Sequence, residues 1–403
     1  MNRLLNASTK LGFGSLRFPR RPDGNVDTEL VSTMFDKFIN EGGLYFEAAY
    51  NYFQSEATLR KCLVERYPRN SYLLADKMPV NEVHRSGDYQ RIFDEQLKKC
   101  GVSWFDFYLL HSVSYKTYKK SEELGGIDFI NNLKLKGLAK NIGFSFHDSA
   151  EVLEDILSKY HDVFDFVQLQ INYLDWDSPV IQSRKCYEVA RKYGLPIFVM
   201  EPIKGGRLVN LPKEAQSIVS TALSVSPAEL ALKWVGEKEK IACVLSGMND
   251  LSQISANTSA LRQPIVLQKL EIETISSIVN ILDSKKMIQC TACRYCIPVC
   301  PKKIPITELL YLFETDNLNH TGRMYERLTD GKGKASECLK CGQCEQICSQ
   351  HLPIRQYLSE IAGEYEKSSS SSNAKKSIKK GLEKMGLINF ARKLKRSFED
   401  RGI

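Results

Sequence analysis

Short apolar runs alternate with amphipathic segments along the first 285 residues. Eight runs rich in apolar and β-favouring residues recur: Leu11–Arg17, Leu44–Ala49, Tyr72–Met78, Phe105–Ser112, Asn141–His147, Phe166–Asn172, Pro196–Ile203 and Ile241–Met248. Most start about 30 residues apart, the length of a strand–helix unit. Segments with helical spacing between them include Thr28–Asn40, Ser55–Glu65, Gln90–Cys100, Ala150–Lys159, Ser183–Lys192 and Pro227–Lys233. The pattern predicts an α/β fold, a (β/α)8 TIM barrel over residues 1–285.

The pattern changes at Cys290. Two cysteine-rich segments follow, with a helical stretch between them at Ile306–Phe313 and another after them at Pro353–Tyr365. This predicts a second, small and mainly helical domain over residues 286–366. Five consecutive serines, Ser368–Ser372, are typical of a flexible linker, so residues 367–403 are expected to be a linker and a tail.

The tail carries most of the chain's positive charge. From residue 374 to the end there are ten Lys or Arg and three Asp or Glu, which accounts for nearly all of the net charge of +8. Apolar residues recur there at about helical spacing and predict an amphipathic basic helix. Such a helix would dock on an anionic membrane surface or on an acidic redox partner. The alternative is a solvated, partly disordered tail. The near-neutral remainder gives no case for nucleic-acid binding.

Twelve cysteines are many for a chain with no sign of export. We expect no transmembrane helix, because no run of eighteen apolar residues occurs. The first 18 residues lack an apolar signal core, so a cytoplasmic location is expected. Clustered cysteines in a reducing compartment indicate metal or redox chemistry. Four scattered ones are expected to be small buried residues: Cys62, Cys100, Cys186 and Cys243.

The other eight cysteines form two runs with the spacing C-x2-C-x2-C-x3-C: Cys290, Cys293, Cys296 and Cys300, then Cys338, Cys341, Cys344 and Cys348. This spacing is typical of bacterial ferredoxins with two [4Fe–4S] clusters, in which the last cysteine of each run ligates the other cluster. One cluster is therefore expected on Cys290, Cys293, Cys296 and Cys348, and the other on Cys338, Cys341, Cys344 and Cys300.

A structural zinc site is the alternative, because it also uses C-x2-C pairs. Zinc takes four ligands in two separated pairs, and two complete runs leave too many thiols at the wrong spacing. Ser349 replaces the proline that follows the first run as Pro301, but this proline ligates nothing. The spacing favours iron–sulfur clusters.

Polar residues stand where three of the predicted strands end. Glu47 and Tyr52 follow the second strand, Lys77 ends the third and His111 ends the fourth. The carboxyl ends of barrel strands meet at one mouth, where barrel enzymes carry their chemistry. The alternative for each residue alone is a satisfied core position.

Residues 8 to about 282 resemble the aldo/keto reductases. The resemblance rests on Leu-Gly-Phe-Gly-Ser-Leu-Arg at 11–17, Tyr-Phe-Glu-Ala-Ala-Tyr-Asn-Tyr at 45–52, Lys77, Asp-Phe-Tyr-Leu-Leu-His at 106–111, Ile-Gly-Phe-Ser at 142–145, Val-Gln at 167–168 and Ser-Gly-Met-Asn at 246–249. The whole chain resembles the subfamily with a C-terminal 4Fe–4S ferredoxin-type domain.

The resemblance implies a catalytic tetrad and a nicotinamide cofactor, NAD(P)H. Tyr52 would donate a proton to a carbonyl, Lys77 would activate it, Glu47 would hold the lysine and His111 would orient the substrate. The residues expected to bind the cofactor are Ser145 and Gln168, at the nicotinamide amide, with Ser246 and Asn257.

The chain departs from the family more at the cofactor than at the tetrad. Glu47 stands where the family has Asp. At the cofactor, Phe146 replaces an asparagine and Met200 replaces an aromatic residue that stacks on the nicotinamide. Gln253 replaces an arginine that binds the 2′-phosphate of NADP.

Two functions follow from these residues. The first is an iron–sulfur oxidoreductase that interconverts a small carbonyl compound and an alcohol and exchanges electrons with a protein partner through two clusters. The alternative is an electron-relay or docking protein whose barrel is catalytically degenerate. The sequence names no substrate and no oligomeric state.

Overall fold

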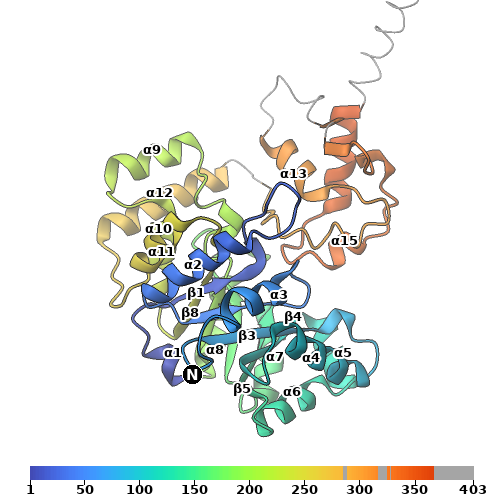
Figure 1. The fold of residues 1–403 in the computed structure, drawn as a ribbon. Helices are drawn as coiled ribbons and strands as arrows, with labels where there is room; N and C mark the ends of the chain where they lie inside the picture. Colours follow the sequence, from blue (N-terminus) through green and yellow to red (C-terminus); the bar gives the residue numbers. More distant parts are fainter. Residues whose placement is uncertain (285–287, 316–324, 327, 367–403) are drawn as a thin grey trace, which may run out of the picture. The chain divides into compact units, whose positions relative to one another are not determined.

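The computed structural model of the protein describes residues 1–284, 288–315, 325–326 and 328–366. The chain divides into two units, residues 1–286 and 287–403, which are described separately (Figure 1). The linker and the basic tail predicted from residue 367 lie outside the described residues. Among the described helices, none combines the length and the apolarity needed to span a bilayer.

The first unit is a closed barrel of eight parallel strands, β1 to β8, in chain order. The strands are β1 Leu11–Gly14, β2 Tyr45–Glu47, β3 Leu73–Pro79, β4 Phe105–Val113, β5 Ala139–Phe146, β6 Phe166–Gln170, β7 Ile197–Met200 and β8 Ile241–Ser246. β8 closes the barrel by pairing with β1. Each predicted apolar run overlaps one strand, so the predicted (β/α)8 barrel is confirmed.

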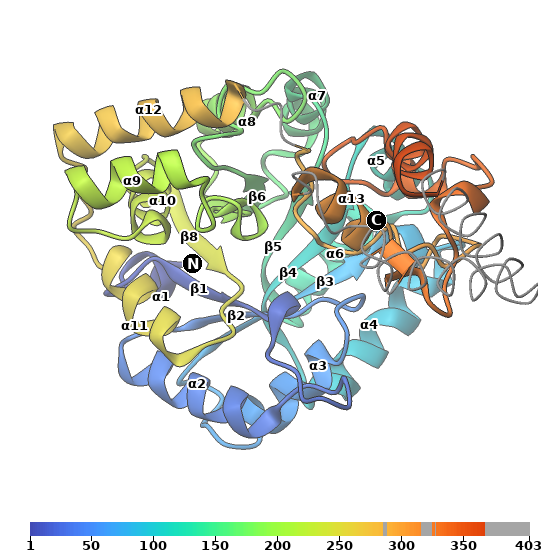
Figure 2. The same cartoon turned by 90° about the horizontal axis from the view of Figure 1, so that it is seen from above.

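Helices surround the strands, as the view from above shows (Figure 2). They are α1 Asn2–Leu5, α2 Thr28–Asn40, α3 Ser55–Leu59, α4 Gly87–Cys100, α5 Tyr115–Glu123, α6 Gly126–Leu135, α7 Ala150–Tyr160, α8 Ser183–Lys192, α9 Lys213–Ala222, α10 Pro227–Gly236, α11 Leu251–Ala260 and α12 Lys269–Ser284. Capping side chains mark their starts. Asp27 accepts from Leu30 N at α2, and Ser226 forms a capping box with Glu229 at α10.

Four aromatic rings fill the inside of the barrel. Tyr45, Phe107, Phe166 and Phe198 are all fully buried, and they contact one another with ring centroids 4.4–5.5 Å apart. Such contacts are favourable in offset or edge-to-face geometry. These rings fill the interior of the barrel, and the hydroxyl of Tyr45 points from them to Glu47, the last residue of β2.

The second unit builds a small helical core. It contains α13 Ile306–Thr315, a 3-10 turn at Ala335–Glu337, α15 Gln343–Gln346 and a helix over residues 354–366. Its buried apolar residues include Ile304, Leu309, Ile354 and Leu358. The predicted helical stretches after the first and second cysteine runs are therefore present, and the small, mainly helical fold is confirmed.

Candidate active site and cysteine hollows

The four predicted catalytic residues lie together at the carboxyl ends of the strands. Glu47 is the last residue of β2, Lys77 lies near the end of β3 and His111 near the end of β4. All three side chains are buried, while Tyr52, in the loop after β2, is partly exposed. A partly exposed phenol beside buried charges is accessible to a small molecule that enters the mouth.

Lys77 contacts two other members of the tetrad, Glu47 and Tyr52. Its Nζ lies 2.5 Å from Glu47 Oε1 and donates a hydrogen bond to Tyr52 Oη at 3.2 Å. It also donates to the carbonyl of Ala48 at 3.3 Å. A cation in contact with a phenol stabilises the phenolate. The arrangement therefore favours loss of a proton from Tyr52.

His111 packs against the same phenol. Its ring meets the ring of Tyr52 edge-on, with centroids 5.7 Å apart and an interplanar angle of 80°. Burial, followed by the positive charges of Lys77 and His147, holds the pKa of His111 well below its usual range. His111 is therefore neutral at pH 7 and offers a ring N–H to a carbonyl oxygen without itself carrying a charge.

Glu47 is held by more than the lysine. Tyr45 Oη and Gln168 Nε2 both donate to its Oε2, at 3.0 and 2.8 Å. Ser15 Oγ donates to its backbone carbonyl at 2.6 Å. Tyr45 was not predicted as a site residue, although a signal was present: it stands two residues before Glu47 in one strand and so faces the same side. These donors keep the carboxylate in place to bind Lys77.

The four predicted cofactor residues form two pairs. Ser145 on β5 and Gln168 on β6 are register partners, and Ser145 Oγ accepts from Ser112 N at 2.8 Å. At the end of β8, Ser246 Oγ accepts from Asn257 Nδ2 of α11 at 3.2 Å. The first pair adjoins the tetrad through the bond from Gln168 to Glu47.

A second buried polar cluster follows β6 and β7. Asp175 accepts from Gln170 Nε2 and Asn172 Nδ2, each at 2.7 Å, and forms an ion pair with Lys204. Asn172 Nδ2 also donates to the carbonyl of Glu201 at 3.1 Å. This cluster was not predicted, because its members form no recognisable sequence motif. It ties together the loops that follow these two strands.

A buried carboxyl lies directly before Lys77 and faces the other side of β3. Asp76 is fully buried and accepts hydrogen bonds from Lys77 N at 2.8 Å and from Cys100 Sγ at 3.6 Å. Burial, with a smaller contribution from the charge of Glu56, raises the pKa of Asp76 well above its usual range. Asp76 therefore keeps a proton in the folded protein.

Asp76→Asn should stabilise the barrel at neutral and alkaline pH. The unfolded chain releases this proton near the ordinary value of 3.8, whereas the folded protein retains it. The stability of the unmodified protein therefore falls as pH rises from that value through the raised pKa. The advantage of the variant should grow by about 1.4 kcal/mol per pH unit within this window. Urea unfolding followed by tryptophan fluorescence measures it, since all three tryptophans lie in the barrel.

Asp128→Asn is the matched control, because Asp128 is an exposed aspartate of the barrel that forms no ion pair with a residue the structure describes. It should leave the pH dependence of unfolding unchanged. A free-energy difference between Asp76→Asn and the unmodified protein that stays constant from about pH 4 to pH 8 would contradict a protonated Asp76.

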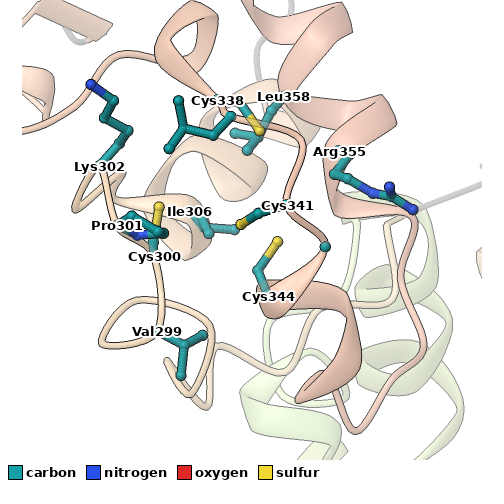
Figure 3. Close-up of a pocket in the computed structure, with 12 residues that line it drawn as sticks. Val299, Cys300, Pro301, Lys302, Ile306, Cys338, Cys341, Cys344, Arg355 and Leu358 are labelled. Carbon is teal, nitrogen blue, oxygen red and sulfur yellow. The ribbon is translucent and has the colours of Figure 1, made fainter.

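In the second unit, the eight clustered cysteines surround two hollows. Cys300, Cys338, Cys341 and Cys344 line one, and Figure 3 shows their side chains around it. The other is lined by Cys290, Cys293, Cys296 and Cys348. The structure thus brings together, around each hollow, three cysteines of one run and the last cysteine of the other.

Both hollows fit an iron–sulfur cluster. Each offers four thiols, the number that a [4Fe–4S] cluster takes. Apolar side chains complete the walls, such as Ile306 and Leu358 at one and Leu310 and Ile354 at the other. Apolar walls limit the access of water to a cluster and so tune its potential.

Comparison with known proteins identifies both units. The model of the aldo/keto reductase family matches residues 10–280, and that of the 4Fe-4S dicluster domain matches residues 289–352. The chain is 25% identical over 214 residues to an uncharacterized oxidoreductase of Schizosaccharomyces pombe, and 24% identical over 230 residues to an NADPH-dependent alpha-keto amide reductase of Saccharomyces cerevisiae. These matches cover 51% and 54% of this chain, and 65% and 70% of the relatives.

Solved structures show the same barrel. An aldo-keto reductase from Klebsiella pneumoniae in complex with NADPH matches with a TM-score of 0.54 and 16% identity, over 67% of this chain and 90% of that one. The holo form of an aldo-keto reductase from Bacillus halodurans matches with a TM-score of 0.54 and 19% identity, over 67% and 91%. With a family model that covers most of its barrel, the chain belongs to the aldo/keto reductase family, and a 4Fe-4S domain follows the barrel.

Proposed function

We propose that the protein is an iron–sulfur oxidoreductase that interconverts a small carbonyl compound and an alcohol and holds two [4Fe–4S] clusters. One observation carries the catalytic part: Lys77 Nζ lies between Glu47 and Tyr52, and the ring of His111 packs against Tyr52. A proton donor, a group that stabilises its anion and a neutral orienting imidazole are the parts that carbonyl reduction requires.

The residues act in order during reduction. NAD(P)H, when bound, supplies a hydride to the carbonyl carbon. The substrate oxygen lies between Tyr52 Oη and the imidazole of His111, and Tyr52 gives it a proton. Lys77 stabilises the resulting phenolate, while Glu47 holds Lys77 in contact with it. Tyr52 then takes a proton from water, which restores the starting state.

Support for NAD(P)H comes from the relatives and from four residues of the barrel. The Saccharomyces relative is named as NADPH-dependent, and the Klebsiella structure holds NADPH. Ser145, Gln168, Ser246 and Asn257 would contact the cofactor. Gln168 offers its amide oxygen for this, because its amide nitrogen is bonded to Glu47.

The eight clustered cysteines support the second part of the proposal. One cluster would be held by Cys300, Cys338, Cys341 and Cys344, and the other by Cys290, Cys293, Cys296 and Cys348. A cluster supplies one-electron chemistry, which implies a redox protein partner. We also propose a cytoplasmic location, where thiols stay reduced and available as ligands.

The rival function, an electron relay with a degenerate barrel, is favoured by one observation. The amide nitrogen of Gln168, expected at the nicotinamide, is bonded to Glu47 instead. If that bond persists, the nicotinamide loses a hydrogen-bond donor. Nucleotide binding and turnover therefore separate the two functions.

Titration of the iron-loaded protein with NADPH and with NADH tests the proposal. We expect quenching of tryptophan fluorescence that saturates with at least one nucleotide. We also expect turnover of a compound from a panel of aldehydes, diketones and α-keto amides, with a KM between about 1 μM and 1 mM. Protein that binds neither nucleotide while carrying intact clusters would overturn the proposed reductase and support the relay.

A further inference from the structure

The two cysteine hollows differ in charge. Apart from its cysteines, the hollow of Cys290, Cys293, Cys296 and Cys348 is lined only by uncharged residues. The hollow of Cys300, Cys338, Cys341 and Cys344 is lined also by Lys302 and Arg355 and by no acidic residue. Figure 3 shows these two basic side chains on opposite sides of the cysteines.

The two sets of cysteines also differ in exposure. Cys341 is exposed, whereas Cys290, Cys293 and Cys348 are partly buried and Cys296 is buried. Leu339, two residues before Cys341, keeps 59% of its surface exposed. Electrons pass between proteins only over short distances, so a partner reaches the more exposed set first.

Positive charge adjoins Cys341: Lys340 precedes it in the chain, and Lys302 lines the same hollow. Lys302, Lys303 and Lys340 are exposed, and none of them forms an ion pair with a residue that the structure describes. Arg355 contributes little net charge, because its guanidinium lies 2.7 Å from the carboxylate of Glu345. Lys302 lines this hollow together with Leu339, and Lys340 follows Leu339 in the chain, so exposed lysines adjoin an exposed apolar residue, as at the rim of protein interfaces.

We propose that this surface, made of Lys302, Lys303, Leu339, Lys340 and Cys341, docks an acidic one-electron carrier protein of the flavodoxin or ferredoxin class. One electron leaves the reduced carrier and enters the cluster held by the cysteine set that contains Cys341, and no covalent bond forms or breaks. Charge complementarity identifies the partner, since a positive patch steers a negative protein to itself and rejects a positive one. The inference rests on the clusters of the proposed function.

Lys340→Glu and Arg294→Glu form a matched pair of tests. Each residue stands directly beside a cysteine, Lys340 before Cys341 and Arg294 after Cys293, and both are exposed. Unlike Lys340, Arg294 is already compensated, because its guanidinium lies 2.7 Å from the carboxylate of Glu308. Reduced flavodoxin, an acidic carrier, is mixed with the oxidised, cluster-loaded protein, and the cluster absorbance is followed in a stopped-flow instrument. Lys340→Glu should lower the second-order rate constant by about 10-fold at low ionic strength, and Arg294→Glu by less than about 2-fold.

Salt and a small reductant complete the experiment. The difference between Lys340→Glu and the unmodified protein should vanish near 1 M salt, where charges are screened within about 3 Å. Photoreduced deazariboflavin, which is uncharged, should reduce all three proteins at equal rates. A larger effect of Arg294→Glu, a rate independent of salt, or no electron transfer from flavodoxin to intact clusters would each overturn the docking surface. Protein without clusters would instead overturn the proposed function.

Discussion

Replacing Tyr52 with Phe should lower kcat for carbonyl reduction by about 10²-fold or more. The change removes one oxygen, and with it the proton that the substrate oxygen must receive. Lys77 would keep its contact with Glu47, 2.5 Å away, so the ring should stay in its place beside His111. Affinity for the nucleotide should therefore change by only a few-fold. Steady-state kinetics on a confirmed substrate, with a fluorescence titration of the nucleotide, measures both quantities.

Tyr50→Phe is the matched control, because it removes the same atom from a tyrosine two residues away. Tyr50 Oη bonds to Glu95 Oε2 at 3.2 Å and takes no part in the tetrad. We expect kcat within about 2-fold of the unmodified enzyme, since the loss of a partly exposed hydrogen bond is a small effect. Equal kcat values for Tyr50→Phe and Tyr52→Phe would exclude Tyr52 as the proton donor.

The barrel strands were predictable because their burial is visible in the sequence. A parallel strand covered on both faces reads as a continuous apolar run, and β3 and β6 are buried at every residue. The ends were less predictable: the run Leu11–Arg17 continues past β1 into a 3-10 turn at Ser15–Arg17. Apolar composition does not distinguish a strand from the turn that ends it.

One helix that the sequence pattern did not predict, α5, has little apolar surface. α5 reads Tyr-Lys-Thr-Tyr-Lys-Lys-Ser-Glu-Glu, and its buried residues are Thr117, Tyr118 and Ser121. Such a helix has a weak apolar stripe. The predicted helix Ser55–Glu65 is present but consists of two kinds of helix. The α-helix α3 ends at Leu59, and a π-helical turn, Arg60–Val64, follows it.

The candidate active site was also only partly predictable from the sequence. Glu47, Lys77 and His111 were predictable as neighbours because β2, β3 and β4 are consecutive in a barrel. The bond from Gln168 to Glu47 joins β6 to β2 across the barrel, between residues 121 positions apart. Strand order does not reveal such a contact, because it depends on how side chains fill the interior.

The core of the second unit is small, which makes its cysteines important for stability as well as chemistry. A unit of this size buries too little apolar surface to be strongly stable alone. Groups that bind only the folded chain add their binding energy to its stability. Because each hollow takes cysteines from both runs, a cluster there would tie together segments 38 or more residues apart, the separation of Cys300 and Cys338. Loss of one cluster should therefore be visible in the iron content and in the stability of this unit.

Two double variants test which cysteines share a cluster. Cys290 and Cys348 line the same hollow, so Cys290→Ala with Cys348→Ala should leave the other set complete and keep one [4Fe–4S] cluster, about four irons per chain. Cys290 and Cys300 line different hollows, so Cys290→Ala with Cys300→Ala removes a ligand from each set and should leave no intact cluster. Iron analysis and electron paramagnetic resonance of the reduced proteins distinguish these results.

Cys186→Ala is the control, because this cysteine is buried in the barrel, where its Sγ donates to the carbonyl of Asp148 at 3.9 Å. It should keep about eight irons per chain, the content of two clusters. If each run held its own cluster, the pattern would reverse: the variant lacking Cys290 and Cys300 would keep one intact cluster and the variant lacking Cys290 and Cys348 would keep none. That reversal would show that the last cysteine of each run ligates the cluster of its own run, against the arrangement of the two hollows.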